Sequence, residues 1–454
     1  MSGPEDPGPS PYPRKVFAFS LGVYVAIAGW LIWRTCVLEP YSDMIDWAAR
    51  WLRLQGDHDL AAYLWAPHNF HHLVWTLSVL DLDIRAFGGQ GYLFVAVGMV
   101  CLAAIAAMMA RLGAQAAGPG LRLVGGGVAL ALSLMGCHVL DANADINTTY
   151  VHALVFAVAA IVLADGKGRV KRAAAVACAV AAGLGSAAGL AVWPALAFGA
   201  WRSGRPVWLL TVLASGAGAV ALYLVGEGAN AGLTTIGRSG PSPLTSILLF
   251  VNYLGLPWMR AVPLIGGVIG VAVLGASVLA LLFRGRREGQ APERTAVSLI
   301  VFSLATAVMA GLARTGDMAP ALVPMRYAVF LIPLHVGLWV LVLPYVRKAW
   351  AARPRAADAA LIGLSLGLLA HQGVMSIYAL RTGDIILRVV ADHREGRPAS
   401  SLTAVFYPVP SRSQEILGQL RARGLFQREL RADPPVGLTL PASAQGISAS
   451  SPGP

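Results

Sequence analysis

Two aspartates three positions apart, Asp43 and Asp46, follow the first long apolar run of the chain. Ser42 or Asp43 can cap a helix that begins here, and the spacing then places both carboxylates on one face of that helix. A pair of carboxylates can act as a general base or bind a divalent cation. The alternative is structural, with an aspartate capping the helix and Asp46 forming an ion pair with Arg50 on a solvated surface.

A histidine-rich segment lies further along the same polar stretch and contains His68, Asn69, His71 and His72. If this segment is helical, His68 and His72 share a face. Such side chains could ligate a metal or form hydrogen bonds with phosphate or sugar hydroxyl groups. The alternative is a set of histidines at the membrane interface that are hydrogen-bonded to backbone carbonyls.

Three further candidates, Arg314, Arg326 and Tyr327, flank the outer ends of two later apolar runs. Because Arg326 begins such a run, its guanidinium is expected at the level of the lipid headgroups, where its fork of donors suits a phosphate or diphosphate. An arginine on the side of the membrane where basic residues are scarce is a functional candidate. The alternative is that Arg326 reaches out to the phosphates of the surrounding lipid.

The elements that position these residues are set by an unusually apolar composition. The chain has 454 residues, of which 56% are hydrophobic and 13% are charged, and its mean hydropathy is +0.63. Soluble globular proteins carry about 25% charged residues, so lipid must solvate much of this chain. The net charge of +12 comes from short Lys and Arg clusters between apolar runs, which argues against a nucleic-acid-binding protein. The four cysteines are scattered, and no phosphate-binding loop, zinc-protease, hydrolase or dinucleotide-binding motif is found.

The apolar runs predict an all-α polytopic membrane protein with about eleven transmembrane helices. Two assignments stay open, because 173–186 and 188–201 form either a tight hairpin or one longer feature, and 244–258 is re-entrant, interfacial or an extra span. Trp47 and Trp51 are expected to hold the helix after the first run at the membrane interface. The predicted runs are 16–35, 92–110, 123–140, 150–164, 173–186, 188–201, 207–225, 262–283, 296–312, 326–346 and 358–379.

The basic clusters indicate the orientation of the chain. When the runs are threaded alternately, the clusters fall on one side, which the positive-inside rule makes cytoplasmic. The N-terminus is therefore expected in the cytoplasm and the C-terminus in the periplasm of a bacterial inner membrane. We expect a disordered cytoplasmic segment 1–13 and a transmembrane domain 14–380 with a long first extracytoplasmic loop, 36–91, that contains interfacial helices. An extracytoplasmic tail, 381–454, is expected to be disordered at its end.

These motifs resemble the GT-C class of integral-membrane glycosyltransferases, and most closely a bacterial subgroup with an acidic-Trp element and Trp-x-x-His-Asn-Glu-His-Arg in its first loop. The matching residues here are Asp46-Trp47 and Trp65-Ala-Pro-His68-Asn69-Phe70-His71-His72. A later Gly-Arg … Ser-Arg-Tyr element looks like Ala313-Arg314 … Met325-Arg326-Tyr327, and the tail sequence Tyr407-Pro-Val-Pro before a short helix is also similar. Phe70 and His72 depart from the subgroup, which carries an acidic residue and an arginine there.

The resemblance implies an enzyme that moves a sugar from a polyprenyl-phosphate carrier to a glycolipid or polysaccharide acceptor outside the cytoplasmic membrane. It implies that Asp43 or Asp46 is the catalytic base and that Arg326, with Arg314, binds the lipid phosphate. A divalent cation, Mg²⁺ or Mn²⁺, could take part of the arginine role, as it does in several members of the class. The remaining residues expected to line the substrate pocket are His68, Asn69, His71, His72 and Tyr327.

The sequence also allows two functions other than glycosyl transfer. One is a transporter or flippase for a lipid-linked saccharide, and the other is a non-catalytic envelope-assembly protein with a GT-C-like fold. Transporters commonly show internal repeats and polar residues near the bilayer midplane. This sequence shows no convincing repeat, and its polar residues gather in the predicted outer loops, which favours an enzyme.

Overall fold

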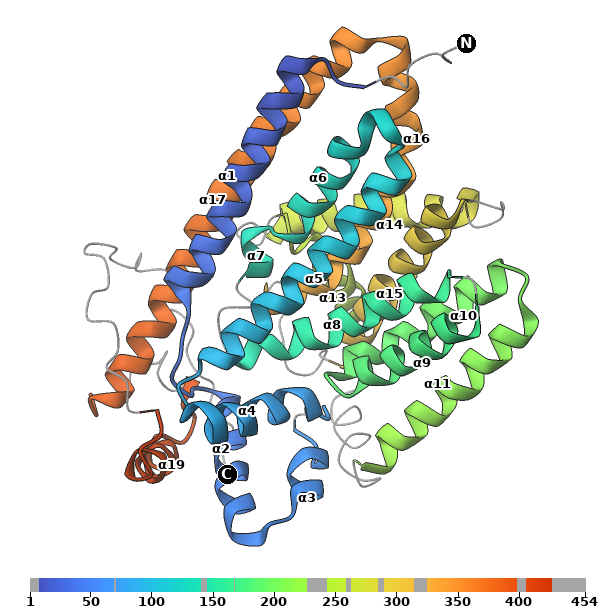
Figure 1. The fold of residues 1–454 in the computed structure, drawn as a ribbon. Coiled ribbons are helices and arrows are strands. Elements are labelled where there is room, and N and C mark those ends of the chain that lie inside the picture. Colours follow the sequence, from blue (N-terminus) through green and yellow to red (C-terminus); the bar gives the residue numbers. More distant parts are fainter. Residues whose placement is uncertain are drawn as a thin grey trace.

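A computed structural model of the chain describes residues 8–68, 71–139, 145–166, 168–226, 243–258, 263–284, 290–313, 325–397 and 406–426. These residues form helices and turns, without strands. Figure 1 shows the long helices gathered in one bundle, with shorter helices at its lower edge. The α-helices are α1 (Pro11–Thr35), α2 (Asp43–Asp57), α3 (Leu60–Trp65), α4 (Val74–Phe87), α5 (Tyr92–Ala117), α6 (Arg122–Ser133), α7 (Gly136–Val139), α8 (Asp145–Ala164), α9 (Arg169–Gly183), α10 (Val192–Arg202), α11 (Pro206–Gly226), α13 (Pro243–Gly255), α14 (Pro263–Arg284), α15 (Ala291–Ala313), α16 (Ile332–Ala352), α17 (Pro354–Arg394) and α19 (Pro410–Ala422), and the 3₁₀ helices are η1 (Pro119–Leu121), η2 (Ala187–Ala191) and η4 (Met325–Leu331).

Eight helices in the described part of the chain are long and apolar enough to cross a membrane. Two shorter apolar helical segments, Pro119–Ser133 and Pro243–Gly255, add to them. The fold is therefore consistent with the predicted polytopic membrane protein, while the number eleven stays a prediction. The eight candidate spans are Pro11–Thr35, Tyr92–Ala117, Asn147–Ala164, Pro206–Leu224, Gly266–Phe283, Ala291–Leu312, Met325–Ala352 and Pro354–Arg394.

The surface of the bundle explains why water would be a poor solvent for it. In α14 the most apolar window is only 17% buried within the protein, and Val268, Val271 and Phe283 are each more than half exposed. A helix that is apolar on its exposed faces is stable when those faces contact lipid.

The helix α17 is longer than the sequence indicates. The predicted run 358–379 lies inside a helix of 41 residues, which is roughly 60 Å long at 1.5 Å per residue. The expected domain boundary at residue 380 thus falls within a continuous helix. Figure 1 shows α17 running beside α1 along its length. Gly383 permits this close approach, because a Cβ there would lie 2.7 Å from Cβ of Thr35.

The structure resolves the first of the two open assignments and limits the second. The runs 173–186 and 188–201 form two separate helices, α9 and α10, and η2 connects them. The run 244–258 forms α13, a helix of 13 residues, which is short for a span of a bilayer that needs about 20 residues.

A second, smaller core lies next to the core of the bundle. We call it the first-loop cluster, and it comprises α2, α3, α4, the C-terminal end of α17, and the segment 406–426 with α19. Trp47 and Trp51 were expected at the membrane interface, and this expectation is wrong. They are only 1% and 5% exposed, because α2 packs against its neighbouring helices and the indole rings fill the space between them.

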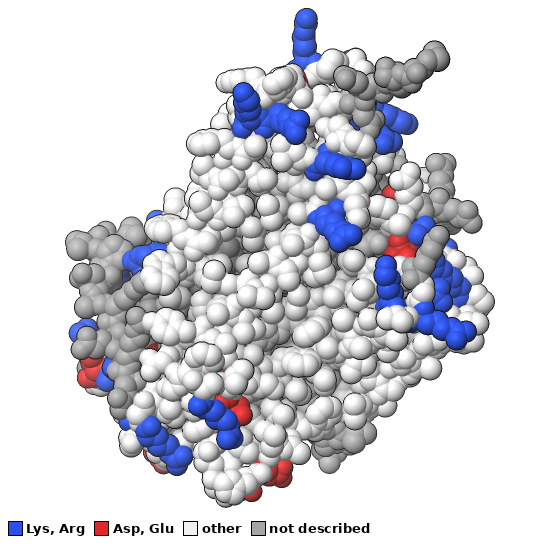
Figure 2. Space-filling model, viewed as in Figure 1, with Lys and Arg blue, Asp and Glu red and all other residues white. Residues whose placement is uncertain are grey.

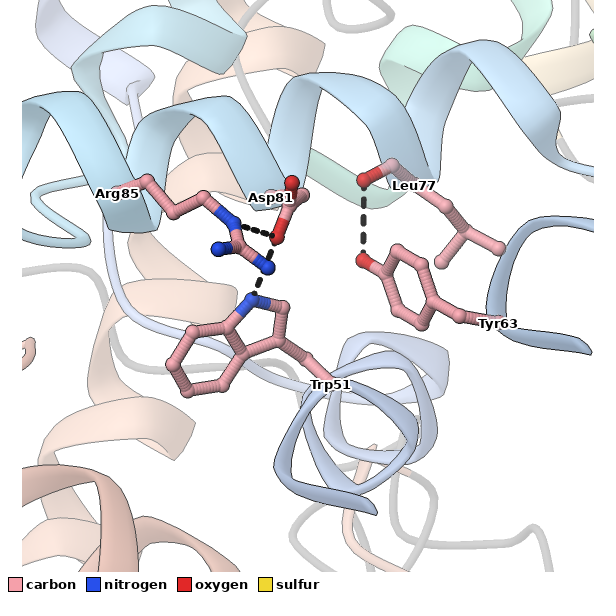
Figure 3. Close-up of polar contacts among 5 residues, drawn as sticks. All are labelled: Trp51, Tyr63, Leu77, Asp81 and Arg85. Carbon is pink, nitrogen blue, oxygen red and sulfur yellow. Dashed lines mark hydrogen bonds and ion pairs between the residues drawn. The ribbon is translucent and has the colours of Figure 1, made fainter. Parts of the chain in front are cut away.

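Side-chain hydrogen bonds fix α2 and α3 on α4, as Figure 3 shows. The indole N–H of Trp51 donates to Asp81 Oδ1 at 3.0 Å, and Arg85 Nε donates to the same oxygen at 2.6 Å. The hydroxyl of Tyr63 in α3 donates to the carbonyl of Leu77 at 3.0 Å. The first loop is consequently a folded unit rather than an irregular connection.

Charged residues divide the visible face of the molecule into zones. Figure 2 shows mainly Lys and Arg along its upper and right margins, a broad area with few charges in the middle, and charges of both signs at its left and lower edges. The first-loop cluster lies at that lower edge, as comparison with Figure 1 shows. An area with few charges between polar zones is the pattern that a bilayer requires.

Candidate functional site

The carboxylate of Asp43 is the acidic group of the candidate site. Asp43 is the first residue of α2, and its Oδ2 lies 3.5 Å from Nε2 of His68. The side chain of Asp43 is 38% exposed, whereas that of His68 is 10% exposed. The ring of His68 also stands edge-on to the indole of Trp47, with centroids 5.9 Å apart.

Backbone and side-chain contacts position the two partners of this pair. Ser42, which precedes α2, has a φ of +53°, and its N–H donates to the carbonyl of Phe406 at 3.0 Å. Its side chain does not cap the helix. Arg50, the residue expected to pair with Asp46, instead donates to the carbonyls of Ala66 and Pro67 at 2.6 and 3.1 Å. Arg50 therefore holds the segment that leads into His68.

His68 and His71 pair with each other in an antiparallel bridge, so the helical arrangement considered for the histidine segment is not formed. The backbone N–H of His68 and that of His71 each donate to the carbonyl of the other at 2.8 Å. Nδ1 of His71 accepts a hydrogen bond from the N–H of Ala187, the first residue of η2, at 3.3 Å. This hydrogen bond of His71 connects the first loop to the bundle.

Arg326 supplies the positive charge of the site. It lies in η4, and it is close enough to Asp43 for the charge of each residue to act on the other. Its Nε is buried and has no hydrogen-bond partner in the described part of the chain. The guanidinium carbon lies 5.8 Å from the ring centroid of Tyr327, whose own ring meets that of Tyr150 at 5.5 Å. A buried guanidinium with an unpaired donor is a group that an anion would stabilise.

The surroundings of Asp43 keep it ionised. Burial by itself raises the pKa of its carboxyl, but the hydrogen bond and charge of His68, and the charges of Arg326 and His71, outweigh burial and lower the pKa below its ordinary value. Asp43 is therefore a carboxylate at neutral pH and can accept a proton or a hydrogen bond.

The second predicted aspartate faces a different partner. Oδ1 of Asp46 lies 2.9 Å from Nη2 of Arg412 in α19, and both side chains are about half exposed. The spacing of three places the two carboxylates near each other along α2, but Asp43 faces His68 of the first loop and Asp46 faces Arg412 of the tail. The structure thus brings Asp43, His68, His71 and Arg326 together and leaves Asp46 beside them.

His72 is fully buried and makes contacts with the protein through both ring nitrogens. Nδ1 lies 2.7 Å from the carbonyl of Trp65 and Nε2 lies 3.1 Å from that of Tyr223, while the ring stacks on the indole of Trp65 at 4.6 Å. This is the carbonyl-bonded alternative considered for the segment. Asn69 and Arg314 lie outside the described residues.

The described residues do not match a divalent cation held by the two aspartates together. Among them, no group of three or more His, Cys, Asp or Glu side chains is placed to hold a metal ion. Asp43 faces a histidine and an arginine, and Asp46 faces an arginine, so neither carboxylate is arranged with the other as a ligand pair.

Two groups of residues near the site were missed by sequence reasoning. Tyr150 interacts with Arg326 and Tyr327, and its position at the beginning of an apolar run is the signal that could have identified it. The second group is a clasp between the end of the first span and the tail, formed by Glu39, Arg394 and Arg421. The carboxylate of Glu39 is 7% exposed, contacts Arg421 directly and lies 3.6 Å from Nη1 of Arg394.

Comparison of the chain with protein-family models, curated proteins and solved structures finds no match. The site must therefore be interpreted from its own chemistry.

Proposed function

We propose that the protein is a GT-C-type membrane glycosyltransferase that moves a sugar from a polyprenyl-phosphate carrier to a glycolipid or polysaccharide acceptor. The observation that carries this proposal is that a carboxylate, Asp43, lies within electrostatic range of Arg326, a buried guanidinium that has an unpaired donor. The two groups come from residues almost 300 positions apart in sequence. A carboxylate and a guanidinium in one site suit a displacement reaction, because the acceptor hydroxyl must lose a proton and the phosphate leaving group must be stabilised.

In the proposed reaction Asp43 removes the proton from an acceptor hydroxyl. The acceptor oxygen then forms a bond to the anomeric carbon of the sugar, and the bond from that carbon to the phosphate oxygen breaks. The leaving polyprenyl phosphate gains negative charge, which Arg326 stabilises through its buried donor. His68 keeps Asp43 ionised and oriented, and His71 adds a polar group beside it.

The location of the site suits an amphipathic donor. A polyprenyl phosphate keeps its chain in lipid and its phosphate at the headgroup level. Arg326 is the second residue of the candidate span Met325–Ala352, and the first loop contacts the bundle through His71 and His72. We propose that the end of the bundle that carries Arg326 faces the periplasm and that the protein resides in a bacterial inner membrane.

The test uses two matched substitutions, Asp43→Asn and Asp46→Asn. Membranes that contain each variant are supplied with a panel of polyprenyl-phosphate sugars, and the mass of any product is recorded. Loss of a general base lowers rates by about 10²–10⁴-fold, so we expect Asp43→Asn to lose transfer and Asp46→Asn to retain most of it. Equal activity of both variants and the unsubstituted protein would contradict the role of Asp43.

Arg326→Gln provides a second arm of the same experiment. It removes the positive charge that we assign to the leaving phosphate, so its loss of transfer should be comparable with that of Asp43→Asn. If no sugar of the panel is transferred by the unsubstituted protein while it accumulates normally, glycosyl transfer from such carriers is the wrong reaction.

A further inference from the structure

A cavity with apolar and polar lining residues lies away from the candidate site, between the ends of α8, α10, α11 and α15. Its lining includes the apolar side chains of Ile161 and Leu196, the indole of Trp208, and the guanidinium groups of Arg205 and Arg294. Arg205 and Arg294 belong to the basic clusters that sequence reasoning places on the cytoplasmic side, opposite the first loop. The proposed glycosyl transfer makes no use of this cavity.

The charge at the cavity is positive. Arg294 is neutralised by Asp165, with Nε–Oδ1 and Nη2–Oδ2 distances of 2.8 and 3.3 Å. The guanidinium of Arg205, in contrast, has no hydrogen-bond or ion-pair partner within the described residues. Arg172 lies beside the same cavity, because its guanidinium carbon is 5.9 Å from the ring centroid of Trp208, and its Nε is buried without a hydrogen-bond partner in the described part of the chain.

Hydroxyl groups supply further donors. Thr295 and Ser298 line the cavity and are only 6% and 7% exposed, and neither side chain has a hydrogen-bond partner among the residues that the structure describes. Gly199 keeps the space in front of one of them open, because a Cβ at this position would lie 2.8 Å from Oγ of Ser298. Buried polar groups of this kind are stable when a ligand or water completes their hydrogen bonds.

The geometry points to a binding site for a phosphate group, and we propose that it takes the headgroup phosphate of an anionic phospholipid. Unpaired guanidinium groups beside hydroxyl donors suit phosphate oxygens. The lipid source is favoured by the neighbouring surface, where Trp201, Val207 and Leu210 are 65%, 78% and 66% exposed. A phospholipid in the cavity would lay its acyl chains against these apolar side chains, whereas a soluble phosphate would leave them uncovered.

The test measures lipid retention by the full-length protein. The purified protein is reconstituted in phosphatidylcholine alone or with phosphatidylglycerol, extracted into mild detergent, and analysed by native mass spectrometry for bound lipid. Arg205→Gln removes the unpaired guanidinium, and Arg355→Gln, an exposed arginine at the beginning of α17, is the matched control. We expect preferential retention of phosphatidylglycerol, reduced about tenfold or more in Arg205→Gln and unchanged in Arg355→Gln.

A second variant and a second ligand make the outcomes distinct. Gly199→Ala narrows the cavity without removing a charge, and we expect it to reduce the retention of phosphatidylglycerol as well. If Arg205→Gln does not accumulate, Gly199→Ala is used in its place. If inorganic phosphate binds the unsubstituted protein but not Arg205→Gln, while phosphatidylglycerol shows no preference over phosphatidylcholine, the ligand is a soluble phosphate and the lipid assignment is overturned. Equal retention by all variants would overturn the site itself.

Discussion

At the scale of single residues, the candidate site depends on how two neighbours change one carboxylate. Asp43 is partly withdrawn from water, which alone would make it a poor anion, and His68 and Arg326 reverse that effect. The histidine is therefore a positioning residue for the proposed reaction, and its contribution can be separated from that of the aspartate through pH dependence.

We predict that His68→Ala shifts the acidic limb of the transfer activity to higher pH. Without the hydrogen bond and charge of His68, burial has more weight, the pKa of Asp43 rises, and the carboxylate becomes protonated at higher pH. The measurement is kcat/KM against pH in reconstituted membranes. His58→Ala, which changes an exposed histidine at the end of α2, is the control and should leave the limb in place.

The same pair gives a second readout that needs no substrate. Because the pKa of Asp43 is lower in the folded protein than in the unfolded chain, its stabilising contribution is present above the unfolded value of about 4. That contribution is lost as the pH falls through the folded value. We therefore expect a smaller acid-induced fall in melting temperature for His68→Ala than for the unsubstituted protein, and an equal fall in both would contradict the interpretation.

The backbone of Ser42 is in a strained conformation. Its φ of +53° lies where L side chains are rarely found, and its hydroxyl does not cap α2. We predict that Ser42→Gly stabilises the protein by about 1 kcal/mol, because glycine adopts this conformation without strain. Ser42→Ala is the matched control and should give no gain. Thermal unfolding in detergent compares the two, and an equal effect of both variants would show that the backbone is unstrained.

At the scale of elements, the clasp is a set of ion pairs that joins the segment after the first span to α17 and to the tail. It joins Glu39 to Arg421 and Arg394, while the neighbouring pair of Asp46 and Arg412 lies on the surface. Burial raises the pKa of Glu39, and the charges of the two arginines in the clasp oppose that rise. The two ion pairs therefore differ in how much solvent screens them.

We predict that Arg421→Ala destabilises the protein by about 2 kcal/mol, because it leaves the carboxylate of Glu39 buried with a weaker partner. Arg412→Ala, which breaks an exposed pair on the same helix, should cost no more than about 0.5 kcal/mol. Thermal unfolding measures both changes, and limited proteolysis should cut the tail sooner in the first variant. Equal effects of the two substitutions would mean that the clasp does not fix the tail.

The elements differ in how well the sequence predicts them. Long apolar runs identify α1, α5 and α15, because continuous apolar length is itself the signal for a span. The full length of α17 cannot be predicted from an apolar run, because its last turns are amphipathic and belong to the first-loop cluster. Trp47 and Trp51 mislead for a related reason: an indole near a span fits both an interface and a small folded core, and tertiary packing decides between them.

At the scale of the whole molecule, residue types indicate which side chains belong to the candidate site, but they do not indicate which of these side chains face one another. Asp43, His68 and Arg326 were selected because charged and hydrogen-bonding groups near the ends of spans are costly without a role. Periodicity could not separate Asp43 from Asp46, because their separate partners come from η4 and α19, far along the chain. Such long-range pairings are set by the fold.

Both proposals also depend on which way the molecule faces, and the charge zones of Figure 2 give the prediction. After replacement of the four native cysteines, single cysteines at Gly56 and Gly418 report on the first-loop cluster, and cysteines at Arg169 and Arg355 report on the basic end. A membrane-impermeant maleimide should label the first two in spheroplasts and the last two only after the membrane is opened, because Lys and Arg clusters remain on the cytoplasmic side. Protection of Gly56→Cys in spheroplasts would place Asp43 in the cytosol, where the proposed periplasmic acceptor is absent, and would remove the basis for glycosyl transfer.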